Sequence, residues 1–288
     1  MIYRRRASPL HAARAAAGGA YCAALATCAL SFQHPLVLAA LTVAAVAAGI
    51  GAGAGRELLA AARFTVPLGL MVAIVNPLVV HEGLTIFFRL GEVPPFGQVD
   101  LTVEALVYGL LLGARVVVVA LCCAVFVAAV DPDELLRLFR RVSFRSALTA
   151  ALAARLMPVL ARDARRMSDA AACRGAGSPP GRVAVLRAVA TSALDRAVDV
   201  AATLEVRGYG ARVAGRTAAE PWSRHDIAFL ATAVTLVALA AGARLLGVAP
   251  FSAYPSLSAP LGAGEALLAL AFPIVALLPF ADRRGIER

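Results

Sequence analysis

The sequence predicts an all-α membrane protein, with about six transmembrane helices and a cytoplasmic domain of amphipathic coupling helices. Three observations carry this prediction. Hydrophobic residues make up 60% of the 288 residues and charged residues only 16%, whereas soluble domains average about 25% charged residues. The apolar residues form long runs without charge, such as 36–54, 64–80 and 227–243. The charged residues are concentrated between and outside these runs.

Six segments are long enough to cross a bilayer. A hydrocarbon core about 30 Å thick needs roughly 20 helical residues, with about 17 as the lower limit. We therefore expect spans near residues 15–32, 36–54, 64–80, 104–130, 226–247 and 264–281. The first follows three arginines, a pattern that secretory signal peptides share, but its length and the spans after it favour a transmembrane helix. The segment 81–103 is expected to be a loop.

Arginine placement predicts the orientation. All but three of the 28 basic residues lie in the N-terminal segment, the turn 55–63, the segment 131–225 or the C-terminal tail; the exceptions are Arg89, Arg115 and Arg244. Cytoplasmic flanks carry an excess of basic residues, so we expect both termini and residues 131–225 in the cytoplasm of a multi-pass cell-membrane protein. The chain then divides into a four-span bundle at 1–130, a cytoplasmic segment at 131–225, and two spans with a tail at 226–288.

The residue types present argue against ATP chemistry and catalysis. All 28 basic residues are arginine, whereas the phosphate-binding loop of an ATPase ends in Gly-Lys-Ser/Thr. ATP-driven work by this chain therefore needs a partner. The five cysteines and four histidines are scattered without metal-ligand spacing, so we expect no cofactor and no enzymatic activity. The net charge of +10 belongs to flanks of spans, and we expect no nucleic-acid partner.

The segment 131–225 is predicted to hold two amphipathic helices. Asp131-Pro132-Asp133-Glu134 supplies a capping residue, a proline and first-turn acids. A helix then runs to Cys173, with Pro158 expected to kink it and an apolar face of Leu148, Leu152, Leu156, Val159 or Leu160, and Met167. A second helix follows from about 183 to 207. Its predicted apolar stripe is Leu186, Val189, Ala193, Ala197, Ala201 and Leu204, opposed by Arg187, Asp195, Arg196 and Asp199.

Both predicted helices end in the same short signature. The first ends in Cys173-Arg174-Gly175 and the second in Glu205-Val206-Arg207-Gly208, so Arg-Gly recurs 33 residues apart, each time with another glycine two positions on. Singly, each motif reads as an ordinary cap, because glycine often follows a helix and arginine complements the helix dipole. Two copies in the one soluble segment of a membrane protein favour a shared role.

This pattern resembles the T components of energy-coupling-factor transporters, the CbiQ/EcfT-like proteins. Members of that family have two long cytoplasmic coupling helices, each ending in Ala-Arg-Gly. The similarity extends to residues 76–83, 131–139 and 155–158. The chain departs from the family pattern at Cys173 and Val206, where the family has alanine; both residues are small and apolar, so we expect docking to survive.

The resemblance implies that the chain couples ATP hydrolysis elsewhere to transport. In the family, the helix ends insert into two cytosolic ABC-type ATPase subunits, and the movement passes to a membrane-embedded substrate-binding S component that takes up a vitamin or transition metal. The ATPase-docking residues implied here are Cys173, Arg174, Gly175, Glu205, Val206, Arg207 and Gly208. Arg115, which is costly in lipid, is left open between helix packing and contact with the S component.

Two other functions fit the sequence less well. The permease subunit of a conventional ABC importer would show one coupling motif in a shorter loop, whereas this chain has two motifs in a long segment. A membrane-embedded transferase would call for Asp or His residues clustered near a membrane face. The acidic residues here are interleaved with arginines along helix faces instead.

Overall fold

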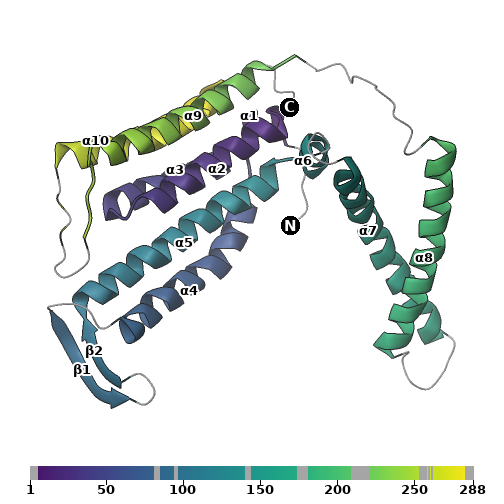
Figure 1. Cartoon of the computed structure of the whole chain (residues 1–288), viewed down its shortest axis with the longest axis horizontal. Coiled ribbons are helices and arrows are strands. Elements are labelled where there is room, and N and C mark those ends of the chain that lie inside the picture. The colour runs from purple at the N-terminus through teal and green to yellow at the C-terminus, as the bar shows by residue number, and fades with distance from the viewer. Residues whose placement is uncertain are drawn as a thin grey trace. The chain divides into compact units, whose positions relative to one another are not determined.

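The computed structural model of the chain describes residues 6–80, 85–93, 97–139, 144–173, 181–208, 221–252, 258, 260 and 262–282. The chain divides into two compact units, Met1–Leu135 with Trp222–Arg288, and Leu136–Pro221. The first holds the apolar helices and the second holds two long helices, α7 (Phe144–Cys173) and α8 (Arg182–Val206) (Figure 1). The all-α membrane class predicted from the sequence is confirmed. The three-part domain division stays a prediction.

A helix lies at each of the six predicted spans. The helices of the first unit are α1 (Pro9–Ala12), α2 (Ala15–Ser31), α3 (Pro35–Gly51), α4 (Gly55–Val79), α5 (Val103–Ala129), α9 (Arg224–Leu245) and α10 (Ala263–Ala281). A further helix, α6 (Pro132–Phe139), begins in the first unit and leads along the chain into the second. Four helices, α4, α5, α9 and α10, are long and apolar enough to cross a membrane, whereas α2 and α3 have 17 residues each.

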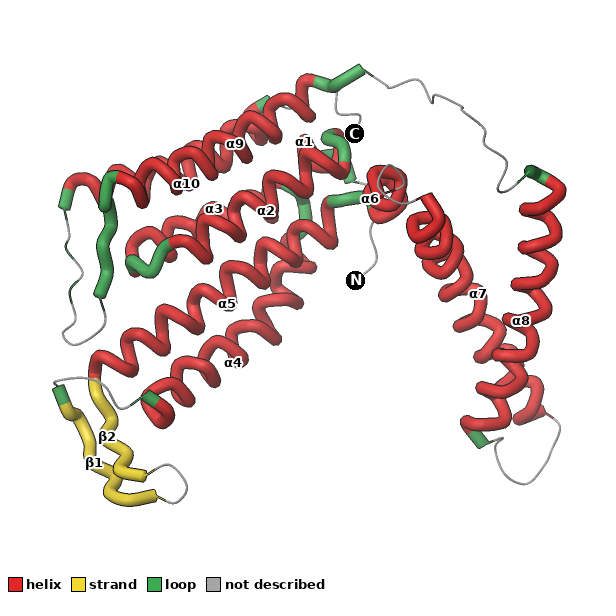
Figure 2. The backbone as a smooth tube through the Cα atoms, viewed as in Figure 1, coloured by secondary structure: helices red, strands yellow, loops and turns green. Residues whose placement is uncertain are grey.

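The segment between α4 and α5 is not the loop that the sequence predicted. It contains an antiparallel hairpin of β1 (Ile86–Val93) and β2 (Gly97–Thr102) (Figure 2). In the register of the two strands, Arg89 lies opposite Asp100. The apolar residues Ile86, Phe87 and Phe88 favour a strand, and Pro94-Pro95 followed by Gly97 is a turn signal. The sequence interpretation did not use these signals.

The core of the bundle lies between α2, α3, α5, α9 and α10. At its centre, the rings of Tyr21, Phe229 and Phe280 meet edge to face, with centroids 5.2–6.1 Å apart. The Tyr21 hydroxyl donates a hydrogen bond to the Ala276 carbonyl oxygen at 2.9 Å. Because its hydroxyl has a partner, the whole tyrosine can be buried, and it packs α2 against both C-terminal helices.

In the second unit, α7 and α8 pack against each other. The half-buried side of α7 includes Leu152, Leu156 and Met167, as predicted, and the helix continues through Pro158. The predicted apolar stripe of α8 is partly wrong, because three of its members are exposed: Leu186, Ala197 and Ala201. Arg196, which the sequence placed on the polar face, instead donates from Nη1 to Asp163 Oδ2 at 3.1 Å. The error arose because α8 has two apolar sides, and periodicity does not say which one packs.

Small residues bring α4 and α5 into close contact. A Cβ atom on Gly113 would overlap the Gly69 carbonyl, and one on Gly109 would lie 2.8 Å from the Ala73 carbonyl oxygen. Asn76 Nδ2 donates to the Ala105 carbonyl oxygen at 2.9 Å. Glycines at such a crossing let helix backbones approach closely in a membrane, where van der Waals packing drives association.

This crossing predicts that Gly113→Ala is destabilising. The added methyl group forces the two helices apart, and overpacking of this kind costs about 1–3 kcal/mol, so the melting temperature of the purified protein in detergent should fall. The matched control is Gly242→Ala, at a helical glycine in α9 with open space around it; alanine there favours the helix by about 1 kcal/mol. Equal melting temperatures for the two variants would contradict the close crossing.

Candidate functional site

The second predicted motif lies at the end of α8. The Arg207 N–H donates to the Thr203 carbonyl oxygen at 3.2 Å, and the Gly208 N–H donates to the Glu205 carbonyl oxygen at 2.9 Å. Gly208 has a φ of 77°, in the left-handed region that glycine adopts without steric cost. Gly208 therefore follows the C-cap residue Arg207, and its left-handed conformation ends the helix with a sharp turn of the backbone.

The side chains at this end are exposed and do not pack against α7. We call residues 205–208 the α8 tip, and all four are exposed. Val206 has 90% of its surface exposed, and the Arg207 side chain makes no ion pair or hydrogen bond in the described part of the chain. A cap requires neither an exposed valine nor an unpaired guanidinium. Both suit a surface that a partner covers.

The first motif is described only at its first residue. Helix α7 ends at Cys173, as the sequence predicted, and this cysteine is exposed. Arg174 and Gly175 lie outside the described residues. The docking roles of both motifs stay predictions. Across the residues that the structure describes, no group of three or more metal-binding side chains is present.

Arg115 belongs to α5, and its side chain lies at the C-terminal end of α2. Its Nη2 donates to the Phe32 carbonyl oxygen at 3.0 Å, and Arg244 Nη1 donates to the Ser31 carbonyl. The last carbonyls of a helix lack intrahelical partners, and its C-terminal dipole favours cations. A 17-residue helix is roughly 25 Å long, less than the roughly 30 Å of a bilayer core. The end of α2 therefore needs partners within the protein, and two arginines provide them.

This geometry supports the packing role for Arg115. Its buried Nε has no hydrogen-bond partner in the described chain, so one donor of this side chain is not used in packing. Contact between Arg115 and an S component stays a prediction. Sequence reasoning identified Arg115 as an interior residue, but its partner at Phe32 lies 83 positions away and had no signal in the sequence.

Two carboxylates meet the opposite end of α2. The Arg14 N–H donates to Asp226 Oδ1 at 2.7 Å, and the Ala15 N–H donates to Glu134 Oε2 at 3.0 Å. The Arg14 side chain also pairs with Asp226, with Nε 3.4 Å from Oδ2. Asp226 is held in place by the Ser223 N–H, which donates to it at 2.9 Å. Anionic groups are favoured at a helix N-terminus, where backbone N–H groups lack partners.

Sequence reasoning missed this second role of Glu134 and Asp226. Each lies in the first turn of its own helix, α6 or α9, and an acid in that position already has a local explanation. The contact with α2 is tertiary, and no local pattern identifies it.

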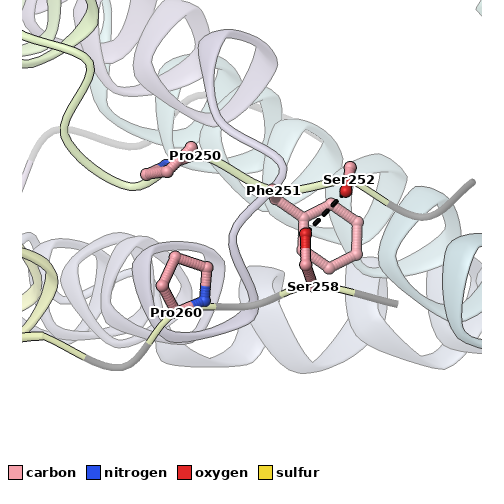
Figure 3. A pocket seen from close by; sticks show the side chains of 5 residues that line it. All are labelled: Pro250, Phe251, Ser252, Ser258 and Pro260. Atoms are coloured by element: carbon pink, nitrogen blue, oxygen red, sulfur yellow. Dashed lines mark hydrogen bonds between the residues drawn. The ribbon is translucent and has the colours of Figure 1, made fainter. Parts of the chain in front are cut away.

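A pocket lies on the connection between α9 and α10. Its described lining is Pro250, Phe251, Ser252, Ser258 and Pro260 (Figure 3). The two serine hydroxyl oxygens are 2.6 Å apart and hydrogen-bond each other. This described lining carries no charge and its hydroxyls are already paired, so it does not resemble a site for a charged ligand or metal.

Comparison with known proteins identifies the sequence pattern. The model of the cobalt transport protein family CbiQ matches residues 8–217, which is well over half of the 288 residues. The matched region runs from α1 past the α8 tip and contains both Arg-Gly motifs. No curated protein matches the chain.

The contact at the C-terminal end of α2 predicts that Arg115→Met lowers stability. A buried carbonyl that loses its partner costs roughly 1–3 kcal/mol, and Phe32 is only 3% exposed. The measurement is the melting temperature in detergent. The control is Arg63→Met, which alters an exposed arginine on α4 and should shift the melting temperature less. A shift for Arg63→Met as large as that for Arg115→Met would refute the role of the contact.

Proposed function

The chain belongs to the cobalt transport protein family CbiQ, and from this membership we propose that it is the transmembrane coupling (T) subunit of an energy-coupling-factor importer. As a member of this family it is a multi-pass membrane component of a transport system and not an enzyme. In the proposed role it receives ATP-driven movement from two cytosolic ATPase subunits and passes it to a membrane-embedded S component that takes up a vitamin or transition metal.

The observation that carries this proposal is the α8 tip. The planar guanidinium of Arg207 offers several directed donors to carboxylate or carbonyl groups of a partner. Gly208 turns the backbone away directly behind it, which allows a partner surface to approach closely. Val206, the neighbouring exposed apolar side chain, adds surface that an ATPase groove would bury.

The helix pair behind the tip is suited to carry movement. Helix α8 has 25 residues and is roughly 37 Å long. The ion pair between Arg196 and Asp163 fastens it to α7, and the Asp163 side chain is only 17% exposed, so solvent screens this pair less than a surface pair. A displacement at the α8 tip then moves both helices together.

The second apolar side of α8 suits the S component. Leu186, Leu194 and Val198 are each about two-thirds exposed, at 69%, 68% and 69%. Their spacing of eight and four residues places them on one side of the helix. With the tip assigned to an ATPase, we propose that the S component covers this exposed apolar side.

The same proposal places both termini and the second unit in the cytoplasm. Most arginines flank the spans on that side, as expected for cytoplasmic segments. Ion pairs also gather at the corresponding end of the bundle. Arg6 pairs with Glu57 at the start of α4, Arg14 with Asp226 at the start of α9, and Arg224 with Asp282 just after α10.

Replacement of the two motif arginines tests the proposal. We expect Arg174→Ala and Arg207→Ala each to weaken co-purification with the ATPases roughly tenfold or more, because hydrogen bonds to charged groups contribute about 1.5–3 kcal/mol. The double variant should lose the complex. Arg187→Ala, at another exposed arginine of α8, is the matched control and should bind like wild type. Full binding and transport by the double variant would reduce both motifs to helix caps.

A further inference from the structure

Helix α6 joins the membrane bundle to the segment that carries α7 and α8. It begins at Pro132, directly after α5 ends at Ala129, and Asp131 starts it by accepting the Asp133 N–H at 2.9 Å. Four residues, 140–143, separate it from α7 in sequence. Its side chains Asp133, Arg137 and Leu138 are exposed, so the bundle covers only part of this helix.

Glu134 attaches α6 to the bundle at a second point. Its Oε2 accepts the Ala15 N–H of α2 at 3.0 Å, across 119 positions of sequence. The Glu134 side chain is partly buried. A carboxylate that accepts from a helix N-terminal amide makes a charge-assisted bond, stronger than a neutral one, and the helix dipole adds to it.

We propose that Glu134 is a positioning residue that passes movement of the coupling helices to the N-terminus of α2. This inference rests on the proposed coupling function. With the chain connection to α5 alone, α6 would be free to turn about residues 130–131. The bond from Glu134 to α2 supplies a second fixed point, so α6 acts as a lever on α2 rather than as a hinge.

The other partners of α2 extend this route into the bundle. The far end of α2 is bound by Arg115 from α5 and by Arg244 from α9. A displacement applied at Ala15 therefore moves a helix whose opposite end is bound to two further spans. Such a connected set of hydrogen bonds and packed helices is the kind of network that carries coupling between distant sites.

Asp226 provides the matched comparison. It makes the same kind of bond to the same helix end, because its Oδ1 accepts the Arg14 N–H at 2.7 Å. However, α9 begins at Arg224 and α8 ends at Val206, so residues 207–223 separate Asp226 from the coupling helices. Only four residues separate α6 from α7 in sequence, fewer than separate α9 from α8. Glu134 and Asp226 thus share the chemistry but differ in their link to α7 and α8.

The test measures nucleotide-dependent hydrogen exchange in the complex of this chain with its ATPases. With ATP in place of ADP, we expect altered exchange in both α7–α8 and α2 of the wild type. Glu134→Ala should keep the response in α7–α8 and lose it in α2. Glu134→Gln, which retains an acceptor oxygen but no charge, should give a smaller response in α2. Asp226→Asn should lower the melting temperature but keep the response in α2.

The outcomes separate this inference from the function on which it rests. If α2 of Glu134→Ala responds to ATP as in wild type, or if Asp226→Asn abolishes the response equally, Glu134 has no special part in coupling and the inference fails while the coupling function stands. If the wild type shows no response even in α7–α8, the coupling function itself fails. Melting temperatures of all variants, measured in parallel, show whether a lost response reflects unfolding.

Discussion

The short helix α2 sets the constraint on which the rest of the bundle depends. Both of its ends carry backbone groups that the helix cannot satisfy itself, and at 17 residues it is at the lower limit of length for crossing a bilayer. Glu134 and Asp226 meet its N-terminus, and Arg115 and Arg244 meet its C-terminus. Asp226 and Arg244 both belong to α9, roughly 27 Å apart by helix rise, which matches the roughly 25 Å length of α2. Helix α9 therefore runs parallel to α2 and holds both of its ends.

The remaining helices are held by other means. Helix α4 contacts α5 through glycines and Asn76, and its outer side chains, such as Leu68, Met71 and Ile74, are exposed and apolar. In a bilayer, lipid or another membrane protein covers such a surface at little cost. Hydrogen bonds to charged side chains thus hold the ends of α2 in the bundle, whereas van der Waals packing holds α4 at its periphery. Helix α6, which precedes α7 in the chain, is bound through Glu134 to the anchored end of α2.

Local signals in the sequence predicted more than tertiary ones. The end of α8 at Val206, predicted at about 207, follows from glycine and helical periodicity, which act within a few residues. Helix α7 is described as far as Cys173, as expected, and the next residues lie outside the described chain. The hairpin at 86–102 was missed because strand pairing is not local, and the packed side of α8 was misassigned because that helix has two apolar sides. Glu134 was interpreted as a first-turn acid of its own helix, and Asp226 was given no role. The first-turn position of Glu134 is correct, and it concealed the second role of this residue at α2.

Residue-resolved hydrogen exchange of the wild-type chain in detergent tests most directly the claim that α2 is anchored at its N-terminus. The first amides of a helix normally exchange quickly, because they have no intrahelical acceptor. The account predicts that the Arg14 and Ala15 amides, bound to Asp226 and Glu134, exchange as slowly as amides in the middle of α2. Fast exchange at both positions, at the rate of an unprotected helix end, would contradict it and remove the basis for a link from the coupling helices to α2.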